Sequence, residues 1–147
     1  MNLVLRDMCA TDLELVLHIE RQAHRHPWTE GNFLDAMQAG YACKAVFFAG
    51  ELTGYAVLML GVDEAELLNI SIAPTQQRRG LGRQLLRAML TLARTQNKLR
   101  VLLEVRASNN AAINLYQTTG FQRIAVRRAY YVAASGREDA IIMDCVL

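Results

Sequence analysis

The residues from Ile70 to Gly82 carry the clearest chemical signal in this sequence. An apolar strand there stops at Pro74, crosses a basic, glycine-bearing loop and enters a long helix. The first turn of a helix has unpaired backbone N–H groups and the positive end of the helix dipole, which together suit a phosphate. The segment lacks the Gly-x-Gly-x-x-Gly of a dinucleotide site and the Gly-Lys-Ser/Thr of a P-loop. It therefore predicts an anion site of another kind.

A carboxylate inside an apolar strand is the second candidate for chemistry. Alternation places Glu104 on one face of the strand with Leu102 and Arg106. A carboxylate is costly to bury without a partner. Glu104 therefore either pairs with Arg106 or another arginine, or acts as a general base at the centre of the sheet.

The third candidate is Tyr116, in a helix that Asn109 is placed to cap. Near Ile113 and Phe121, a tyrosine is ordinarily a core aromatic with its hydroxyl at the rim. A hydroxyl with an ordinary pKa of about 10 can also protonate a thiolate leaving group, whose conjugate thiol has a pKa of about 8.5. Both interpretations stay open for Tyr116.

The composition excludes several classes of protein. With 147 residues, 52% hydrophobic and 20% charged, the chain is expected to form one compact domain over residues 1–147. The net charge of +2 is too small to argue for direct nucleic-acid binding, and the apolar runs are too short to span a membrane. The arginines Arg78, Arg79, Arg83 and Arg87 form either a solvated helix face or part of the anion site.

The cysteines and histidines do not predict a metal site. Cys9, Cys43 and Cys145 form no metal-binding spacing, and with no apparent signal peptide we expect a reducing, cytoplasmic location. His24 and His26 lack an evident third ligand, so we interpret them as loop-surface residues. The oligomeric state is left open.

The elements that must position these residues follow from periodicity and turn signals. We expect strands over residues 2–6, 42–49, 52–61, 66–73, 101–105, 121–132 and 139–146, and helices over 11–23, 29–40, 79–97 and 109–119. The order β-α-α-β-β-β-α-β-α-β-β predicts an α/β protein with a mixed sheet and helices on both faces.

Local signals mark the first two helices. Thr11 and Glu14 form a candidate capping box. Thr29 is placed to cap the second helix, and Trp28 to pack on Phe33 as a hydrophobic staple.

The loop Gln77-Arg78-Arg79-Gly80-Leu81-Gly82 matches the Gln/Arg-x-x-Gly-x-Gly signature of the GNAT acetyltransferases. The element order resembles the GNAT fold over nearly the whole chain. The resemblance implies an acyltransferase with acetyl-CoA as co-substrate and no metal. It also implies that the strand over 66–73 splays from its parallel neighbour and offers backbone groups to pantetheine and to the acetyl carbonyl.

Further segments resemble the RimI family of ribosomal-protein-alanine N-acetyltransferases. They are His18-Ile19-Glu20, Ala23-His24, Pro27-Trp28, Leu103 to Asn109, Arg127 to Tyr131 and Gly136 to Met143. This resemblance implies acetyl transfer, in a ternary complex, to the N-terminal alanine of a small-subunit ribosomal protein, S18. It implies that Glu104 is the base and Tyr116 the acid. The implied cofactor-binding residues are Ile70, Ser71, Ile72, Arg78, Arg79, Gly80, Leu81, Gly82, Arg83 and Asn109.

Two alternatives remain at this point. One is a broader acetyltransferase acting on other protein N-termini, lysines or polyamines. The other is a non-catalytic acyl-CoA-binding module, which would need the phosphate loop but neither Glu104 nor Tyr116.

Overall fold

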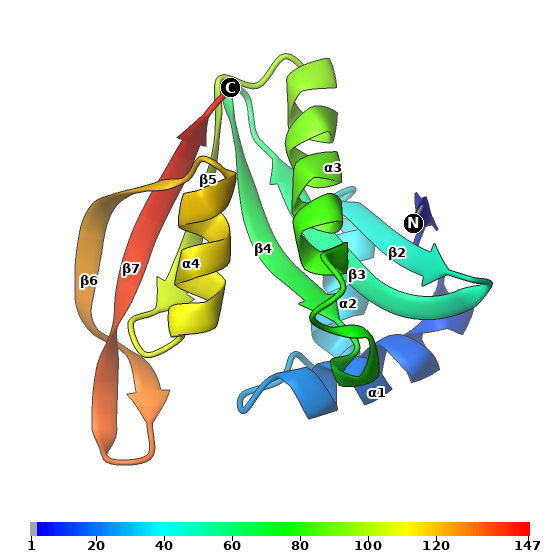
Figure 1. Cartoon of the computed structure of the whole chain (residues 1–147), viewed down its shortest axis with the longest axis horizontal. Coiled ribbons are helices and arrows are strands. Elements are labelled where there is room, and N and C mark those ends of the chain that lie inside the picture. The colour runs from blue at the N-terminus through cyan, green and yellow to red at the C-terminus, as the bar shows by residue number, and fades with distance from the viewer. Residues whose placement is uncertain (1–2) are drawn as a thin grey trace.

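A computed structural model describes residues 3–147 and contains one seven-stranded mixed sheet with the strand order β1-β2-β3-β4-β5-β7-β6 (Figure 1). The elements are β1 Val4–Asp7, α1 Leu13–Ala23, α2 Glu30–Gln38, β2 Ala42–Phe48, β3 Glu51–Leu60, β4 Glu64–Ile72, α3 Leu81–Thr95, β5 Arg100–Arg106, α4 Asn110–Thr119, β6 Gln122–Ala133 and β7 Gly136–Val146. Short 3₁₀ turns cover Ala10–Asp12 and Pro74–Gln76. The predicted order of helices and strands is confirmed.

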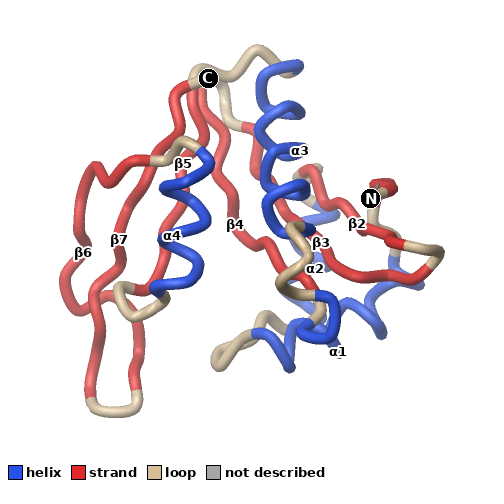
Figure 2. Tube along the Cα trace, in the orientation of Figure 1, coloured by secondary structure: helices blue, strands red, loops and turns tan. Residues whose placement is uncertain are grey.

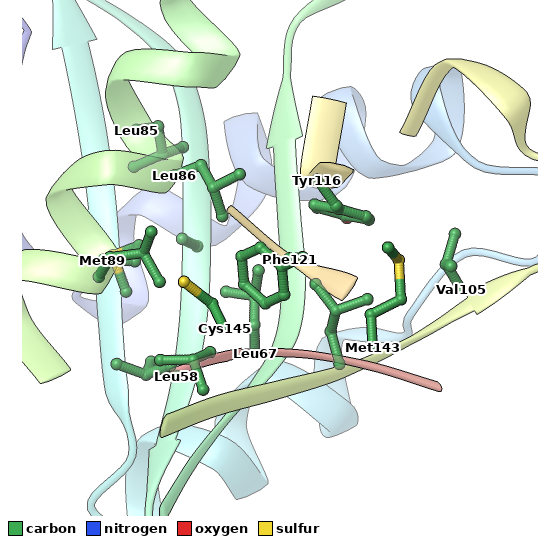
Figure 3. Packing of buried hydrophobic residues seen from close by; sticks show 14 of the residues in the cluster. Leu58, Leu67, Leu85, Leu86, Met89, Val105, Tyr116, Phe121, Met143 and Cys145 are labelled. Carbon is green, nitrogen blue, oxygen red and sulfur yellow. The ribbon is translucent and has the colours of Figure 1, made fainter. Parts of the chain in front are cut away.

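Helices cover the two faces of the sheet in separate pairs (Figures 1 and 2). On one face, α3 and α4 pack against the central strands, and Figure 3 shows Leu86 and Met89 of α3 facing Phe121 and Cys145. On the other face, α1 and α2 pack around Phe33 and Tyr55. The predicted mixed sheet with helices on both faces is therefore correct.

Strands β4 and β5 are parallel neighbours that separate along their length. Pairing is confined to Glu64–Glu66 of β4 and Arg100–Leu102 of β5. The rest of β4 pairs with β3 alone, and Figure 1 shows the two strands diverging beyond their shared end. The splay implied by the family resemblance is present, so backbone groups of β4 are left free on the side of β5.

A β-bulge in β4 changes which side chains face each layer. Leu67 pairs with Leu58 and Asn69 pairs with Val57, so Leu68 is the extra residue. Leu67 consequently faces the core beneath α3, whereas Asn69 contacts Glu20 of α1. Without the bulge, strict alternation through residues 66–73 would place the side chains of Leu67 and Asn69 on the same face.

The cap of the second helix is confirmed. Thr29 Oγ1 accepts a hydrogen bond from the Asn32 amide at 3.2 Å. The rings of Trp28 and Phe33 lie 5.0 Å apart, as the predicted staple requires.

The expected capping box at Thr11 and Glu14 is wrong. The Cys9 amide donates to Asp12 Oδ2 at 2.9 Å, and Arg6 holds the same carboxylate in two hydrogen bonds. This ion pair with Arg6 lowers the pKa of Asp12 and favours a 3₁₀ turn before α1.

The expected strands over 42–49 and 52–61 leave residues 50–51 for the hairpin turn between β2 and β3, but the turn lies one residue earlier. Its two positive-φ residues are Ala49 at 52° and Gly50 at 81°. Two consecutive left-handed residues match the twist of the flanking strands. Among residues 3–147, no helix is long and apolar enough to cross a membrane.

Candidate active site

The basic loop joins β4 to α3 and adopts a conformation suited to an anion. Gly80 is the N-cap of α3 with φ 75°, and Arg78 also has a positive φ of 65°. A Cβ at Gly80 would meet no atom within 4 Å, so the loop faces open space there. Because the first-turn amides of α3 have no intrahelical acceptor, they can bind an anion.

A cavity, here called the loop cavity, opens beside these amides. It is lined by Ile70, Ser71, Ile72, Gln77, Arg78, Gly80, Gly82, Arg83, Ala112, Leu115 and Tyr116. Its walls combine the basic loop with the apolar side chains of β4 and α4. Seven of the ten residues implied as cofactor ligands therefore come together here.

The three other implied ligands lie elsewhere or contribute differently. Arg79 is exposed and does not line the loop cavity. The Leu81 side chain is 1% exposed and packs in the core, so only its backbone amide could meet a ligand. Asn109 lies on a neighbouring cavity and caps α4, accepting a hydrogen bond from the Ala112 amide at 3.2 Å.

Gln77, the first residue of the signature, has a visible structural role. Its Nε2 donates to the Ile72 carbonyl at 3.0 Å. This bond ties the loop to the end of β4. It therefore fixes the strand end relative to the helix N-terminus.

A second cavity, here called the strand cavity, lies where β4 and β5 diverge. It is lined by Glu20, His24, His26, Trp28, Leu67, Leu68, Asn69, Ile70, Leu103, Glu104, Val105, Arg106, Asn109, Tyr116 and Tyr131. Tyr116 and Ile70 line both cavities. The two predicted acid–base residues thus lie on one cavity, and Tyr116 stands at its junction with the loop cavity.

Glu104 pairs with an arginine, but not with the nearest one in sequence. Its Oε1 accepts a hydrogen bond from Arg127 of β6 at 2.8 Å, and its side chain is 23% exposed. Arg106 instead pairs with Glu138 at 3.0 Å and lies over the Tyr131 ring. The carboxylate is therefore held in place while keeping access to the strand cavity.

Tyr116 keeps its proton over the physiological pH range. The side chain is 9% exposed, and burial, followed by the nearby Tyr131 hydroxyl, raises the pKa of Tyr116 to about 12. Its ring packs on Phe121 with centroids 5.7 Å apart, beside the left-handed Gly120 that ends α4. The hydroxyl therefore carries a proton at neutral pH, and the raised pKa makes it a weaker acid than an exposed tyrosine.

The sequence reasoning missed a buried polar cluster on the far wall of the strand cavity. Glu20 is 1% exposed and accepts hydrogen bonds from Tyr55 and Asn69. Of the two histidines interpreted as loop-surface residues, His26 is exposed, whereas His24 is 36% exposed and also contacts the sheet, with its Nε2 2.6 Å from Ser71 Oγ. The spacing Leu13, Val16, Leu17, Glu20 could have shown that Glu20 lies on the buried stripe of α1.

Glu66 is a further carboxyl group on β4 that the sequence did not single out. Burial raises its pKa, and the negative charge of Glu104 adds to that rise while Arg127 opposes it. Within residues 3–147, no cluster of three or more His, Cys, Asp or Glu side chains is placed to hold a metal ion.

The fold, with two cavities that share Ile70 and Tyr116, is that of the GNAT acyltransferases. The sequence model of the Acetyltransferase (GNAT) family matches residues 13–121. The chain belongs to this family, whose members use acetyl-CoA, and it is an N-acetyltransferase.

Particular relatives agree with the motifs. The chain is 42% identical over 133 residues to the [ribosomal protein bS18]-alanine N-acetyltransferase of Escherichia coli K12, covering 90% of each protein. The crystal structure of the ribosomal-protein-S18-alanine N-acetyltransferase from Escherichia coli superposes with a TM-score of 0.91 at 39% identity, covering 99% of this chain and 94% of that one. The structure of yncA from Salmonella typhimurium with acetyl-CoA shares the fold, with a TM-score of 0.83 at 23% identity over 100% and 95% of the two chains.

Proposed function

We propose that this protein transfers the acetyl group of acetyl-CoA to the N-terminal alanine amine of ribosomal protein bS18. The observation that carries the proposal is the meeting of two cavities at Tyr116, in a chain with 42% identity to the Escherichia coli enzyme of that activity. One cavity suits the donor and the other suits the acceptor. Residues 1–147 would form a single catalytic domain that works in the cytoplasm.

The loop cavity has the chemistry that acetyl-CoA requires. The amides of Gly80, Leu81 and Gly82 would bind its pyrophosphate, with Arg78 and Arg83 supplying positive charge. The apolar walls from Ile70, Ile72 and Leu115 suit the pantetheine arm. Its thioester would then lie near Tyr116.

Glu104 would act as the base toward the acceptor. An N-terminal amine has a pKa of about 7.7–8.0, so a carboxylate acting through a water can remove its proton near neutral pH. The neutral nitrogen attacks the thioester carbonyl carbon and forms the new C–N bond. Free amides of β4 beside the diverging β5 would stabilise the negative charge that develops on the carbonyl oxygen.

Tyr116 would act as the acid. The C–S bond breaks as the carbonyl re-forms, and the departing thiolate takes the hydroxyl proton of Tyr116. Glu104 takes the proton whose loss makes the amine neutral, and the nitrogen loses a second proton as the amide forms, which restores the Tyr116 hydroxyl through solvent; the products are an N-acetylated terminus and free CoA. Direct attack in a ternary complex is favoured because none of the three described cysteines lines either cavity.

The test is intact-mass analysis of a peptide copying the bS18 N-terminus, incubated with the protein and acetyl-CoA. A matched peptide has a blocked N-terminus and a free internal lysine. We expect one added acetyl group on the free terminus only. Acetylation of both peptides would instead identify a broader protein acetyltransferase, and no transfer despite measured acetyl-CoA binding would contradict the proposal.

A further inference from the structure

Glu20 is a buried carboxylate that the proposed acyl transfer does not use. It is 1% exposed, and its Oε1 accepts hydrogen bonds from the Tyr55 hydroxyl at 2.5 Å and Asn69 Nδ2 at 3.0 Å. Its Oε2 accepts from the Trp28 amide at 2.9 Å. These donors compensate a negative charge that would otherwise be costly to bury. Glu20 lies in the wall of the strand cavity.

The bonds around Glu20 orient a hydrogen-bond chain that ends at His24. Because a carboxylate only accepts, Asn69 must turn its Nδ2 to Glu20 and its Oδ1 toward Ser71. Ser71 Oγ donates to that Oδ1 at 3.4 Å, which leaves its oxygen to accept from His24 Nε2 at 2.6 Å. Glu20 Oε1 lies 3.7 Å from the same nitrogen and also favours a proton there. The network therefore assigns the Nε2–H tautomer to a neutral His24.

This tautomer leaves Nδ1 of His24 as a hydrogen-bond acceptor. The backbone of the residue is fixed at the end of α1, where the His24 amide donates to the Glu20 carbonyl at 3.0 Å. The His24 side chain is 36% exposed and lines the strand cavity together with Glu104. A substrate amine bound in this cavity would thus contact the Glu104 carboxylate from β5 and the His24 imidazole from the end of α1.

We propose that His24 binds the acceptor, with its Nδ1 accepting a hydrogen bond from the α-amine that Glu104 deprotonates. Glu20, Asn69 and Ser71 are positioning residues, since they hold the imidazole in the tautomer that leaves Nδ1 free. His24 orients the amine before attack and takes no part in bond making. The inference deepens the proposed function and rests on it.

Two substitutions of His24 distinguish the hydrogen bond of Nε2 to Ser71 from the proposed hydrogen bond of Nδ1 to the substrate amine. His24→Gln places an amide near Nε2, so it keeps a donor for Ser71 and removes the acceptor at Nδ1. His24→Asn places an amide near Nδ1, so its oxygen can still accept, whereas the bond to Ser71 is lost. His18→Gln, on the exposed side of α1, is the matched control.

Steady-state kinetics with the bS18 peptide and acetyl-CoA provide the measurement. We expect His24→Gln to raise the KM for peptide about tenfold and His24→Asn to raise it at most about threefold, as the loss of one hydrogen bond predicts. The KM for acetyl-CoA should stay at the wild-type value in both variants, because His24 does not line the loop cavity. Thermal melting of each variant checks that it is folded.

The opposite order, with His24→Asn impaired and His24→Gln normal, would mean that His24 only supports Ser71 and would overturn the inference. Equal behaviour of the two variants, both impaired or both normal, would overturn it as well. A wild-type protein that does not acetylate the peptide would refute the proposed function itself. The wild type is assayed first, so this failure is distinguished from failure of the inference about His24.

Discussion

Glu104 and Tyr116 reach the same cavity from different elements and in different surroundings. Glu104 is held by Arg127 at 2.8 Å and keeps contact with solvent. Tyr116 is buried against Phe121, and burial raises its pKa to about 12. These surroundings fit the proposed division of roles, in which a carboxylate in contact with solvent is the base and a hydroxyl that is protonated at neutral pH is the acid.

Tyr116→Phe should lower kcat about 100-fold, because general-acid assistance contributes about 10²–10⁴-fold. The variant keeps the ring and its packing on Phe121, so its melting temperature should stay close to that of the wild type. Assays of CoA release measure kcat, and thermal melting measures the melting temperature. An unchanged kcat would reduce Tyr116 to a packing residue.

Glu104→Gln should slow transfer most at pH values below the pKa of the acceptor amine. Above about pH 8 the amine is already neutral, so the deficit relative to wild type should narrow as pH rises. The kcat/KM for peptide, measured from about pH 6 to about pH 9, tests this trend. A deficit that is constant across the range would contradict a role as base, and Kd for acetyl-CoA serves as the control.

At the scale of elements, the divergence of β4 from β5 creates the site. The strands pair only through Glu64–Glu66 and Arg100–Leu102, and the bulge at Leu68 then re-aims the side chains of β4. Ile70 and Ile72 consequently lie beside the loop cavity, while Asn69 and Ser71 join the Glu20 network. One strand thus lines both the loop cavity and the strand cavity.

Gly54 lies on β3, the other neighbour of β4, and Gly54→Ala should displace β4. A Cβ at Gly54 would lie 2.4 Å from the Ser71 carbonyl oxygen and 2.8 Å from Ile72 Cδ1, so β4 would have to move. We expect a loss of about 1–3 kcal/mol in the free energy of unfolding, as for other overpacked sites, and a higher KM for acetyl-CoA.

Urea unfolding and steady-state kinetics measure these two effects. Gly31→Ala in α2 is the control, since its Cβ would contact only Thr29 Oγ1 at 3.7 Å, and it should leave the KM for acetyl-CoA unchanged. A Gly54→Ala protein with wild-type stability would show that β3 and β4 adjust without strain.

At the scale of the whole molecule, two hydrophobic cores on opposite faces hold one sheet between them. The cluster under α3 and α4 includes Leu85, Met89 and Tyr116, and the cluster under α1 and α2 includes Phe33 and Tyr55. Each core contains one buried tyrosine whose pKa is raised, mainly by burial. The free energy of unfolding should therefore depend on pH in the alkaline range.

Stability should fall as pH rises above about 10, the pKa of a tyrosine in the unfolded chain. The folded state keeps the proton of Tyr116 up to its raised pKa of about 12, so the unfolded state loses its proton first. The stabilisation from Tyr116 is complete below about pH 10 and is lost between about pH 10 and pH 12, amounting to about 2–3 kcal/mol.

Urea unfolding at a series of pH values measures how steeply the free energy of unfolding falls with pH. The stability of Tyr116→Phe should fall less steeply over this interval, and the other groups whose pKa is raised by burial contribute the remaining loss: Tyr55, Tyr131, Cys43 and Cys145. Identical slopes for the two proteins would contradict the raised pKa of Tyr116.

The order of the elements, the glycine-bearing loop before α3, and the caps at Thr29 and Asn109 were predictable from the sequence. Each depends on residues close together in the chain, whose periodicity, turn preferences and hydrogen-bonding groups act locally. The assignments of Glu104 as base and Tyr116 as acid came from family motifs and stay predictions. The structure shows that both side chains line one cavity.

Tertiary structure alone decided how distant segments meet. Arg127 is the partner of Glu104, and the half-exposed His24 contacts Ser71 of β4. The bulge at Leu68 sets which residues of β4 face each layer. Local patterns carry no information on such contacts, because strand register and the packing of α1 on the sheet depend on the whole core forming together.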